Sequence, residues 1–416
     1  MLTVTRNLII LLLVFSGVSS AQTVNQQQAR FGIDAACNAV QLQNLEFTLT
    51  PGQSNLLAQC GSPNLLEGTN FTLERIAASE AFAIGDALID TSESQISHIY
   101  ARINAHRSNR SNSKLPYRQG GSASADTFVD HPLGWFVNGN TSTGKINGAG
   151  LQMDADFDSH DLSIGADYRF SRHVVVGAAI GLTSHQTDFS GDNGDLASDG
   201  LNLSLFASWY ELDEGYADLV VGLGRGAFEL ERRINFPLEP DEFAIGSTDA
   251  NAFTFAISAA RTLNQGPWTF GPMMRLKLTS SSVDGFTEGS SSGSNGSGTT
   301  MDIASHTLRS TRMVAGLDVS RSINTSRAVF VPVLRAEYVI ENEQDKGEIT
   351  ATFTHDPSST QMRFIGTERD DSAVNLTVGS SVLFTRGTSA FIFHESRLSN
   401  TYVSQRWIKL GLRMHF

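Results

Sequence analysis

The sequence predicts an all-β fold, a membrane-spanning antiparallel β-barrel preceded by a small helical segment. Three observations lead to this prediction. Long stretches of the chain alternate apolar and polar residues, the connections between them alternate short and long, and no apolar run long enough for a transmembrane helix follows the N-terminus. Because lipid offers the backbone no hydrogen-bond partners, such a chain can cross a bilayer only as a closed barrel.

The C-terminal stretch from Tyr402 to the end shows the alternation most clearly. Apolar side chains alternate there with polar residues and glycine, and the chain stops on an aromatic residue. A chain end in water usually frays and is polar. An apolar end is typical of a closing barrel strand, whose outer face meets lipid and whose inner face meets a wet lumen. The apolar positions are Ile408, Leu410, Leu412, Met414 and Phe416.

Residues 1–21 are predicted to be a secretory signal peptide. Arg6 supplies the positive charge, Leu8 to Phe15 the apolar core, and Ser19-Ser20-Ala21 the small residues of a cleavage site. A membrane anchor fits less well, because the apolar core is too short to span a bilayer. The mature chain would then begin at Gln22 in an oxidising compartment.

Residues 22–90 are predicted to be a short helical segment. Apolar residues from Phe31 to Leu45 recur at helical spacing around Cys37, and a turn at Thr50 to Ser54 leads into a second helix with Cys60. In an oxidising compartment we expect the two cysteines to form a disulfide, contributing roughly 3 kcal/mol. A metal pair or a reactive thiol is the alternative, and it lacks nearby ligands. So small a segment cannot bury a core without this staple or a partner surface.

Residues 91–132 are predicted to be a helix and a linker. From Thr91 to Arg107 apolar residues fall at helical spacing, and at ~1.5 Å per residue the helix would be roughly 25 Å long, the height of a barrel's apolar band. The helix is either an ordinary surface helix or a plug that passes through the barrel. The polar, Ser/Gly-containing stretch from Asn109 to Asp130 is predicted to be a linker that marks a domain boundary.

Residues 133–416 are predicted to form the barrel. Twelve long stretches carry the period-two pattern, as where Leu162, Ile164 and Ala166 alternate with polar residues or glycine. The predicted strands are Leu133 to Asn147, Ser159 to Phe170, His173 to Phe189, Ser198 to Leu212, Tyr216 to Ile234, Asn251 to Leu263, Trp268 to Gly285, His306 to Ile323, Ala328 to Asn342, Asp371 to Thr385, Ser389 to Leu398, and Tyr402 to Phe416.

The connections between these strands give an independent indication. Every second connection is tight, as at Ser171-Arg172, whereas the long ones, such as Phe286 to Ser305 and Glu343 to Asp370, fall at the opposite end. This arrangement is typical of an outer-membrane barrel, with short periplasmic turns and long outer loops. Pro272 and Pro332 lie inside predicted strands, near their inner ends, and we expect a local irregularity there.

The inner face of the predicted barrel is charged. An Arg or Lys side chain that faced lipid at mid-depth would cost ~2–4 kcal/mol, so charges within the strands are expected to point into the lumen. These charges have two possible meanings. The first is a wet pore able to hold a helix or an extended polypeptide, and the second is a set of lumen ion pairs that merely tolerates solvent. The predicted lumen charges are Asp167, Arg275, Lys277, Arg312, Arg335, Glu337, Glu395, Lys409 and Arg413.

The barrel region resembles the translocator β-domain of autotransporters, the type V secretion proteins. The resemblance rests on Gly165 to Phe170, Val176 to Gly181, Asp218 to Arg225 followed by Arg232-Arg233-Ile234, Gly271-Pro272 with Arg275-Leu276, and the closing Gly411 to Phe416. It implies a twelve-stranded outer-membrane barrel with a helix in its lumen and an N-terminal passenger, here residues 22–90, at the cell surface. It also implies that periplasmic chaperones and the barrel-assembly machinery are partners, the latter recognising the C-terminal apolar positions as an assembly signal.

Other functions find little support in the sequence. With 30 Lys+Arg against 43 Asp+Glu and no basic patch, we expect no nucleic-acid partner. Gly289 to Gly293 matches a nucleophile-elbow pattern but lies in a Gly/Ser-rich loop, and Asp188 to Asp195 lacks the register of a calcium loop. We therefore expect no catalytic residue, metal or cofactor, and outer-membrane lipid as the surroundings. The alternative function is a porin-like channel plugged by its N-terminal helix.

Overall fold

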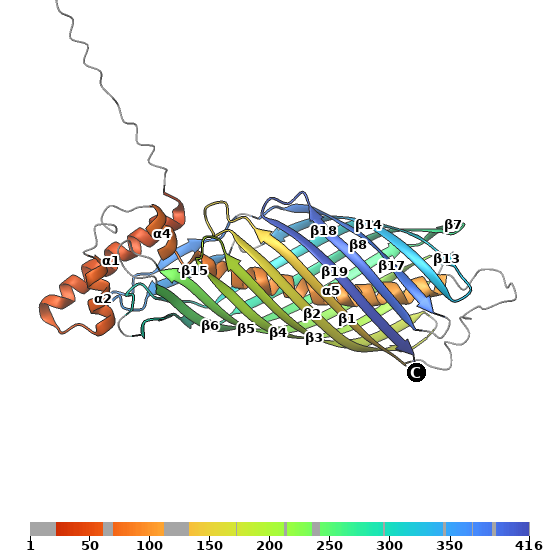
Figure 1. Cartoon of the computed structure of the whole chain (residues 1–416), viewed down its shortest axis with the longest axis horizontal. Helices are drawn as coiled ribbons and strands as arrows, with labels where there is room; N and C mark the ends of the chain where they lie inside the picture. The colour runs from red at the N-terminus through yellow and green to blue at the C-terminus, as the bar shows by residue number, and fades with distance from the viewer. Residues whose placement is uncertain are drawn as a thin grey trace, which may run out of the picture.

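The computed structural model describes residues 22–60, 70–111, 133–171, 173–211, 214–234, 242–293, 296–343, 347–367, 369–384 and 388–415. Within these ranges the predicted fold is confirmed: twelve long strands form one closed antiparallel barrel (Figure 1). Strand β1 (Leu133–Ile146) pairs with β19 (Val403–His415) to complete the ring. The other long strands are β2 (Ala155–Arg169), β3 (Val174–Phe189), β4 (Gly194–Glu211), β5 (Gly215–Ile234), β6 (Glu242–Arg261), β8 (Trp268–Val283), β12 (His306–Arg321), β14 (Ala328–Glu343), β17 (Ser372–Phe384) and β18 (Ser389–Leu398).

The barrel has two distinct ends. At one end, which we call the closing end, Gly134 pairs with His415 and the tight connections lie. At the other end, which we call the cap end, β2, β4 and β6 begin at Ala155, Gly194 and Glu242, earlier than predicted. These extensions were missed because the pattern changes beyond the belt: on β2, for example, Phe157 points inward whereas Asp156 and Asp158 point outward, the reverse of the belt pattern.

The outer face of the barrel carries an apolar belt. On β5, Leu223 is exposed, whereas further toward the cap end the outward side chains are Arg225 and Glu229. The belt therefore ends near this level, and the strands continue beyond it. Exposed apolar residues of the belt include Leu162, Ile164, Ile180, Leu182, Leu203, Leu205, Ile257, Met274, Met313, Leu334, Val378 and Ile392. Such a belt is what a lipid-facing surface requires.

The two strand prolines lie one residue beyond the end of a hydrogen-bonded ladder. The pairing of β8 with β6 ends at Met273, next to Pro272, and the pairing of β14 with β12 ends at Val333, next to Pro332. Two short strands in the turns, β7 (Leu263–Gln265) and β13 (Ile323–Asn324), then take over the pairing. The expected irregularity is thus a break in one ladder, placed where proline has no N–H to donate.

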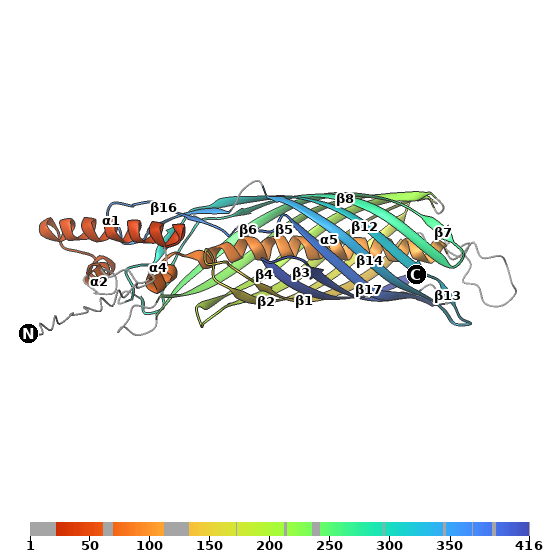
Figure 2. The same cartoon turned by 90° about the horizontal axis from the view of Figure 1, so that it is seen from above.

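A long helix, α5 (Phe82–Ser111), runs inside the barrel (Figures 1 and 2). It contains the predicted helix from Thr91 to Arg107, but it begins earlier, so the boundary predicted between residues 90 and 91 falls inside it. The chain breaks instead at Ala78, whose φ of 44° is left-handed, just before η1 (Ser79–Ala81). An alanine in this conformation carries no sequence signal. Residues 109–111 of the predicted linker also belong to α5, and residues 112–130 lie outside the described ranges.

The cap end is covered by a folded unit that we call the outer cap. It contains α1 (Val24–Glu46), α2 (Pro51–Cys60), α4 (Asn70–Ile76) and η1, together with a four-stranded sheet of β9 (Phe286–Thr287), β11 (Met301–Ile303), β15 (Glu348–Phe353) and β16 (Met362–Ile365). The sheet was not predicted, because its strands are too short to show a period. A further short strand, β10 (Gly289–Ser290), pairs with β6.

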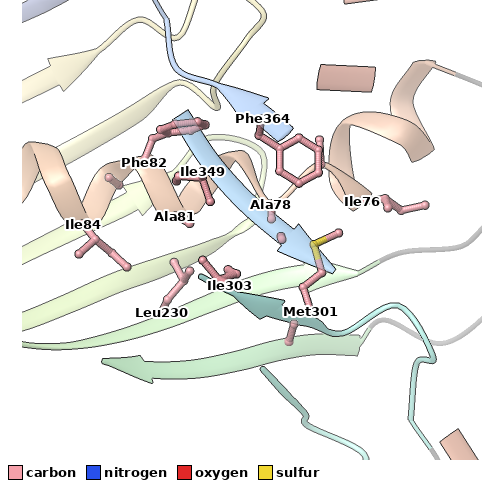
Figure 3. Packing of buried hydrophobic residues seen from close by; sticks show 14 of the residues in the cluster. Ile76, Ala78, Ala81, Phe82, Ile84, Leu230, Met301, Ile303, Ile349 and Phe364 are labelled. Carbon is pink, nitrogen blue, oxygen red and sulfur yellow. The ribbon is translucent and has the colours of Figure 1, made fainter. Parts of the chain in front are cut away.

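The outer cap and the extended barrel strands share one hydrophobic core. Figure 3 shows Ile76 and Ala78 beside η1, Phe364 and Ile349 from the small sheet, and Leu230 from the barrel wall, which belong to one buried cluster. Each of these side chains is buried. The helical segment therefore finds the partner surface that its size requires, and that surface is its own barrel.

A disulfide and a close helix–sheet contact hold α1 in place. Cys37 and Cys60 are bonded and join α1 to α2, as the sequence predicts. Gly32 of α1 lies so close to the side chain of Met362 in β16 that a Cβ at this position would clash. Helix α1 is thus fixed both to α2 and to the four-stranded sheet of the outer cap.

Candidate functional site

The candidate functional site is the lumen of the barrel, where the predicted charges lie close to one another. Arg275 and Arg335 lie 3.5 Å and 3.9 Å from the carboxylate of Glu337, and Arg335 also pairs with Asp318. Lys409 lies 2.7 Å from Glu395. Arg413 lies 3.3 Å from Asp167. All of these side chains are inside the barrel, where each charge is compensated by a neighbour.

The remaining two predicted lumen cations, Lys277 and Arg312, pair with α5 rather than with the wall alone. Both bind the carboxylate of Glu93, and Arg312 also reaches Glu341 at 2.7 Å. Sequence reasoning missed Glu93, since helical spacing alone does not show which wall a side chain will meet. The available signal was that Glu93 is the only acidic residue from Thr91 to Arg107 in the sequence.

Another face of α5 is bonded to the wall by hydrogen bonds between polar side chains. Ser94 donates to Asp161 at 2.5 Å, and the side-chain amide of Asn140 donates to both residues at 3.1 Å. One turn along, the ring Nδ1 of His98 lies 2.7 Å from the hydroxyl of Ser163. Because these groups come from β1 and β2, they hold the helix against one side of the lumen.

Closer to the closing end, α5 packs on the same wall through apolar side chains. Ile99 and Ile103 are buried in a cluster with Phe136 and Phe206. Tyr100 points instead toward the charged side, where the Arg275 guanidinium lies 4.2 Å from the centre of its ring. The helix therefore fills one half of the lumen tightly and faces a charged half on the other side.

The start of α5 is anchored where the lumen opens into the outer cap. Asp86 pairs with Arg369 and accepts a hydrogen bond of 2.7 Å from the hydroxyl of Tyr402. The side-chain amide of Gln405 donates to Asp90 at 2.6 Å. These contacts fix the height of the helix in the barrel.

Beneath the outer cap lies a buried ionic cluster. Arg232 is fully buried and forms two hydrogen bonds, of 3.0 Å and 2.5 Å, with the carboxylate of Glu288. It also donates to the backbone oxygen of Arg75 at 2.7 Å. Nearby, burial raises the pKa of Glu80 to about 7, an effect that Arg232 opposes and Glu288 reinforces. The cluster joins the barrel wall, a loop and the cap at one point.

The predicted C-terminal positions lie on the outer face. Ile408, Leu410, Leu412 and Met414 are exposed in the apolar belt. Phe416 lies outside the described residues, as does the predicted signal peptide at 1–21. The assembly role of these positions therefore stays a prediction.

The described residues offer no constructed site for a metal. Within them, no group of three or more His, Cys, Asp and Glu side chains is placed to hold an ion. Asp161 points inward while its neighbour His160 is exposed and contacts Thr141, so these two do not form a dyad. Likewise, none of the described helices is long and apolar enough to cross a bilayer.

Comparison with known proteins identifies the fold and the family. The model of the family described as "Autotransporter beta-domain" matches residues 135–392, more than half of the chain. The chain belongs to the autotransporter β-domain family. Members of this family are translocator barrels of the bacterial outer membrane, and the predicted resemblance is confirmed.

Solved structures agree with this assignment. The translocator domain of autotransporter NalP from Neisseria meningitidis is 16% identical over 77% of this chain and 98% of that chain, with a TM-score of 0.52. The β-domain of the Bordetella autotransporter BrkA is 16% identical over 68% of this chain and 100% of that chain, with a TM-score of 0.51. At this identity the likeness concerns the fold. None of the curated proteins matches the chain in sequence.

Proposed function

We propose that this autotransporter barrel exports its own N-terminal segment and displays it at the cell surface as the outer cap. The observation that carries the proposal is the course of α5, which runs through the lumen from the cap end to the closing end (Figure 2). The segment before it is thereby held at the cap end, whereas β19 finishes at His415 at the closing end. With the tight turns in the periplasm, as in other outer-membrane barrels, the cap faces outward.

The cap remains attached in this proposal. Its core is continuous with that of the barrel, and the ion pair of Arg232 and Glu288 is buried beneath it. A passenger that is released needs no such interface. Display of a folded cap therefore accounts for the contacts better than secretion of a free peptide.

The partners follow from the exposed surfaces. The apolar belt would contact outer-membrane lipid, and the outward residues of β19 would be recognised by the barrel-assembly machinery after periplasmic chaperones deliver the chain. We propose transport and display as the role, with no catalytic step. An open porin-like channel fits less well, because α5 and the cap occupy the lumen and its outer mouth.

An epitope tag tests this orientation. A tag placed directly before Gln22 should be bound by antibody on intact cells. A matched tag inserted between Ser111 and Leu133, at the closing end, should be bound only after the outer membrane is permeabilised. Binding of both tags only after permeabilisation would contradict surface display.

A further inference from the structure

The charged half of the lumen contains two cavities that meet at a single side chain of α5. The larger, of about 170 Å³, extends from Glu93 to residues of the closing end such as Thr262 and Ser322. The smaller, of about 70 Å³, extends from Glu93 to Asp86 and Tyr402 at the cap end. Among the described residues, Glu93 is the one that lines both cavities. Each cavity has room for several water molecules.

On another face of the helix at this level, the described residues leave a cavity of only about 10 Å³, between Gln95 and Asn202. There Ser94 is bonded to Asp161 and Asn140, and the following turns pack on Phe136 and Phe206. Among these cavities of the described residues, the two that have room for several water molecules beside α5 therefore meet at Glu93.

The contacts at this point close the path. The Glu93 carboxylate bridges Lys277 of β8 and Arg312 of β12, whose side chains are only 4% and 7% exposed. Arg312 is held in turn by Glu341, which accepts a hydrogen bond of 2.7 Å from Ser310. The bridge thus ties the helix to the wall across the gap between the cavities.

We propose that Glu93, Lys277 and Arg312 form an ionic gate on a conduction path that runs beside the lumen helix. This goes beyond export and display. When the gate is open, small ions can cross the folded barrel beside α5, and the ion pairs of Glu93 keep the gate closed. Loss of the Glu93 carboxylate removes one negative charge from the junction of the two cavities, where Lys277 and Arg312 remain and Arg312 still pairs with Glu341, so the junction becomes more positive. Cationic constrictions select anions, so the opened path should prefer chloride to potassium.

Conductance of the full-length protein in planar lipid bilayers tests the gate. The unmodified protein should show little current. Glu93→Gln should raise the single-channel conductance, and Glu93→Ala should raise it further, with a reversal potential in a KCl gradient shifted toward that of chloride. Glu348→Gln is the control: this carboxylate pairs with Arg363 at 3.5 Å in the outer cap and lines neither cavity, so its loss should leave the current as in the unmodified protein.

A cross-link distinguishes an open gate from loss of the helix. Cysteines replacing Ser94 and Asn140, whose polar atoms lie 3.1 Å apart, would lock α5 to the wall when oxidised. In the Glu93→Ala background the current should persist after oxidation. Loss of the current on cross-linking, equal current in Glu348→Gln, silence of both Glu93 variants, or strong current in the unmodified protein would each overturn the proposal.

Discussion

The side-chain amide of Asn25 pairs with both backbone polar groups of Ile365, a residue 340 positions further along the chain. It accepts from the Ile365 N–H at 2.8 Å and donates to the Ile365 oxygen at 2.9 Å. Because β16 is an edge strand, its outer backbone groups would otherwise lack partners. The side chain of Asn25 thus takes the place of a neighbouring strand and fastens α1 to the four-stranded sheet of the outer cap.

Asn25→Ala should loosen the outer cap. The substitution leaves the N–H and C=O of a part-buried edge strand unpaired, at a cost of ~1–3 kcal/mol. Hydrogen exchange of the β16 amides should become faster. Gln27→Ala, which changes an exposed side chain on the same helix, is the control and should leave their exchange unchanged. Equal exchange in both variants would show that the Asn25 contact does not hold the cap.

Arg232→Met should destabilise the cap far more than loss of a surface ion pair. It leaves the buried Glu288 carboxylate without its partner, which typically costs ~3–5 kcal/mol. Arg225→Met removes an exposed pair with Asp249, worth about 0–1 kcal/mol, and is the control. Hydrogen exchange of the cap amides, measured across a urea titration, would give the stability of the cap in both variants. Similar midpoints for the two variants would contradict the importance of the buried pair.

The cap should become less stable as the pH rises from about 5 to about 8. The pKa of Glu80 is about 7 in the folded chain against an ordinary value of 4.5, so the folded state holds a proton that the unfolded state has lost. Stability from this group is complete below about 4.5 and is lost as the pH passes 7. Thermal unfolding followed by circular dichroism should show this slope. Glu80→Gln should flatten it, whereas Glu46→Gln, at an exposed position of α1, should not.

Reduction of the disulfide should weaken the cap and leave the barrel intact. The bond between Cys37 and Cys60 spans a sequence separation of 23, for which loss of the constraint costs roughly 3 kcal/mol. Double replacement by serine should make α1 and α2 sensitive to protease in the purified protein. The barrel strands should keep their resistance, and cleavage within them would indicate that cap and barrel unfold together.

The barrel could be predicted from the sequence because its signal, the alternation of apolar and polar residues, lies within each strand. Leu203 and Leu205 must alternate with polar residues when one face meets lipid, and this period survives without any knowledge of the fold. The cap could not be predicted in the same way. Asn25 and Ile365, or Arg232 and Glu288, meet only because distant loops fold together, and nothing in their neighbouring residues indicates a partner.

The arrangement of the lumen could be predicted only in part. Arg275 and Lys277 could be placed inside, since residues two positions apart on a strand share one face. This rule does not say which wall residue each will meet, nor that a helix carboxylate, Glu93, will bind two of the cations. The start of α5 was misplaced for a related reason: the break at Ala78 lies where η1 packs in the core shared by cap and barrel, and local spacing does not show such a contact.

Cross-linking of α5 to the barrel wall in living cells tests the central claim most directly. Oxidation of the Ser94→Cys, Asn140→Cys double variant should convert nearly all of the outer-membrane protein to a cross-linked form with altered mobility in denaturing gels. Ser94→Cys with Thr141→Cys, whose second cysteine would lie on the outer face, should remain unlinked. Failure of the first pair to link, or equal linking of both, would show that the helix does not occupy the lumen.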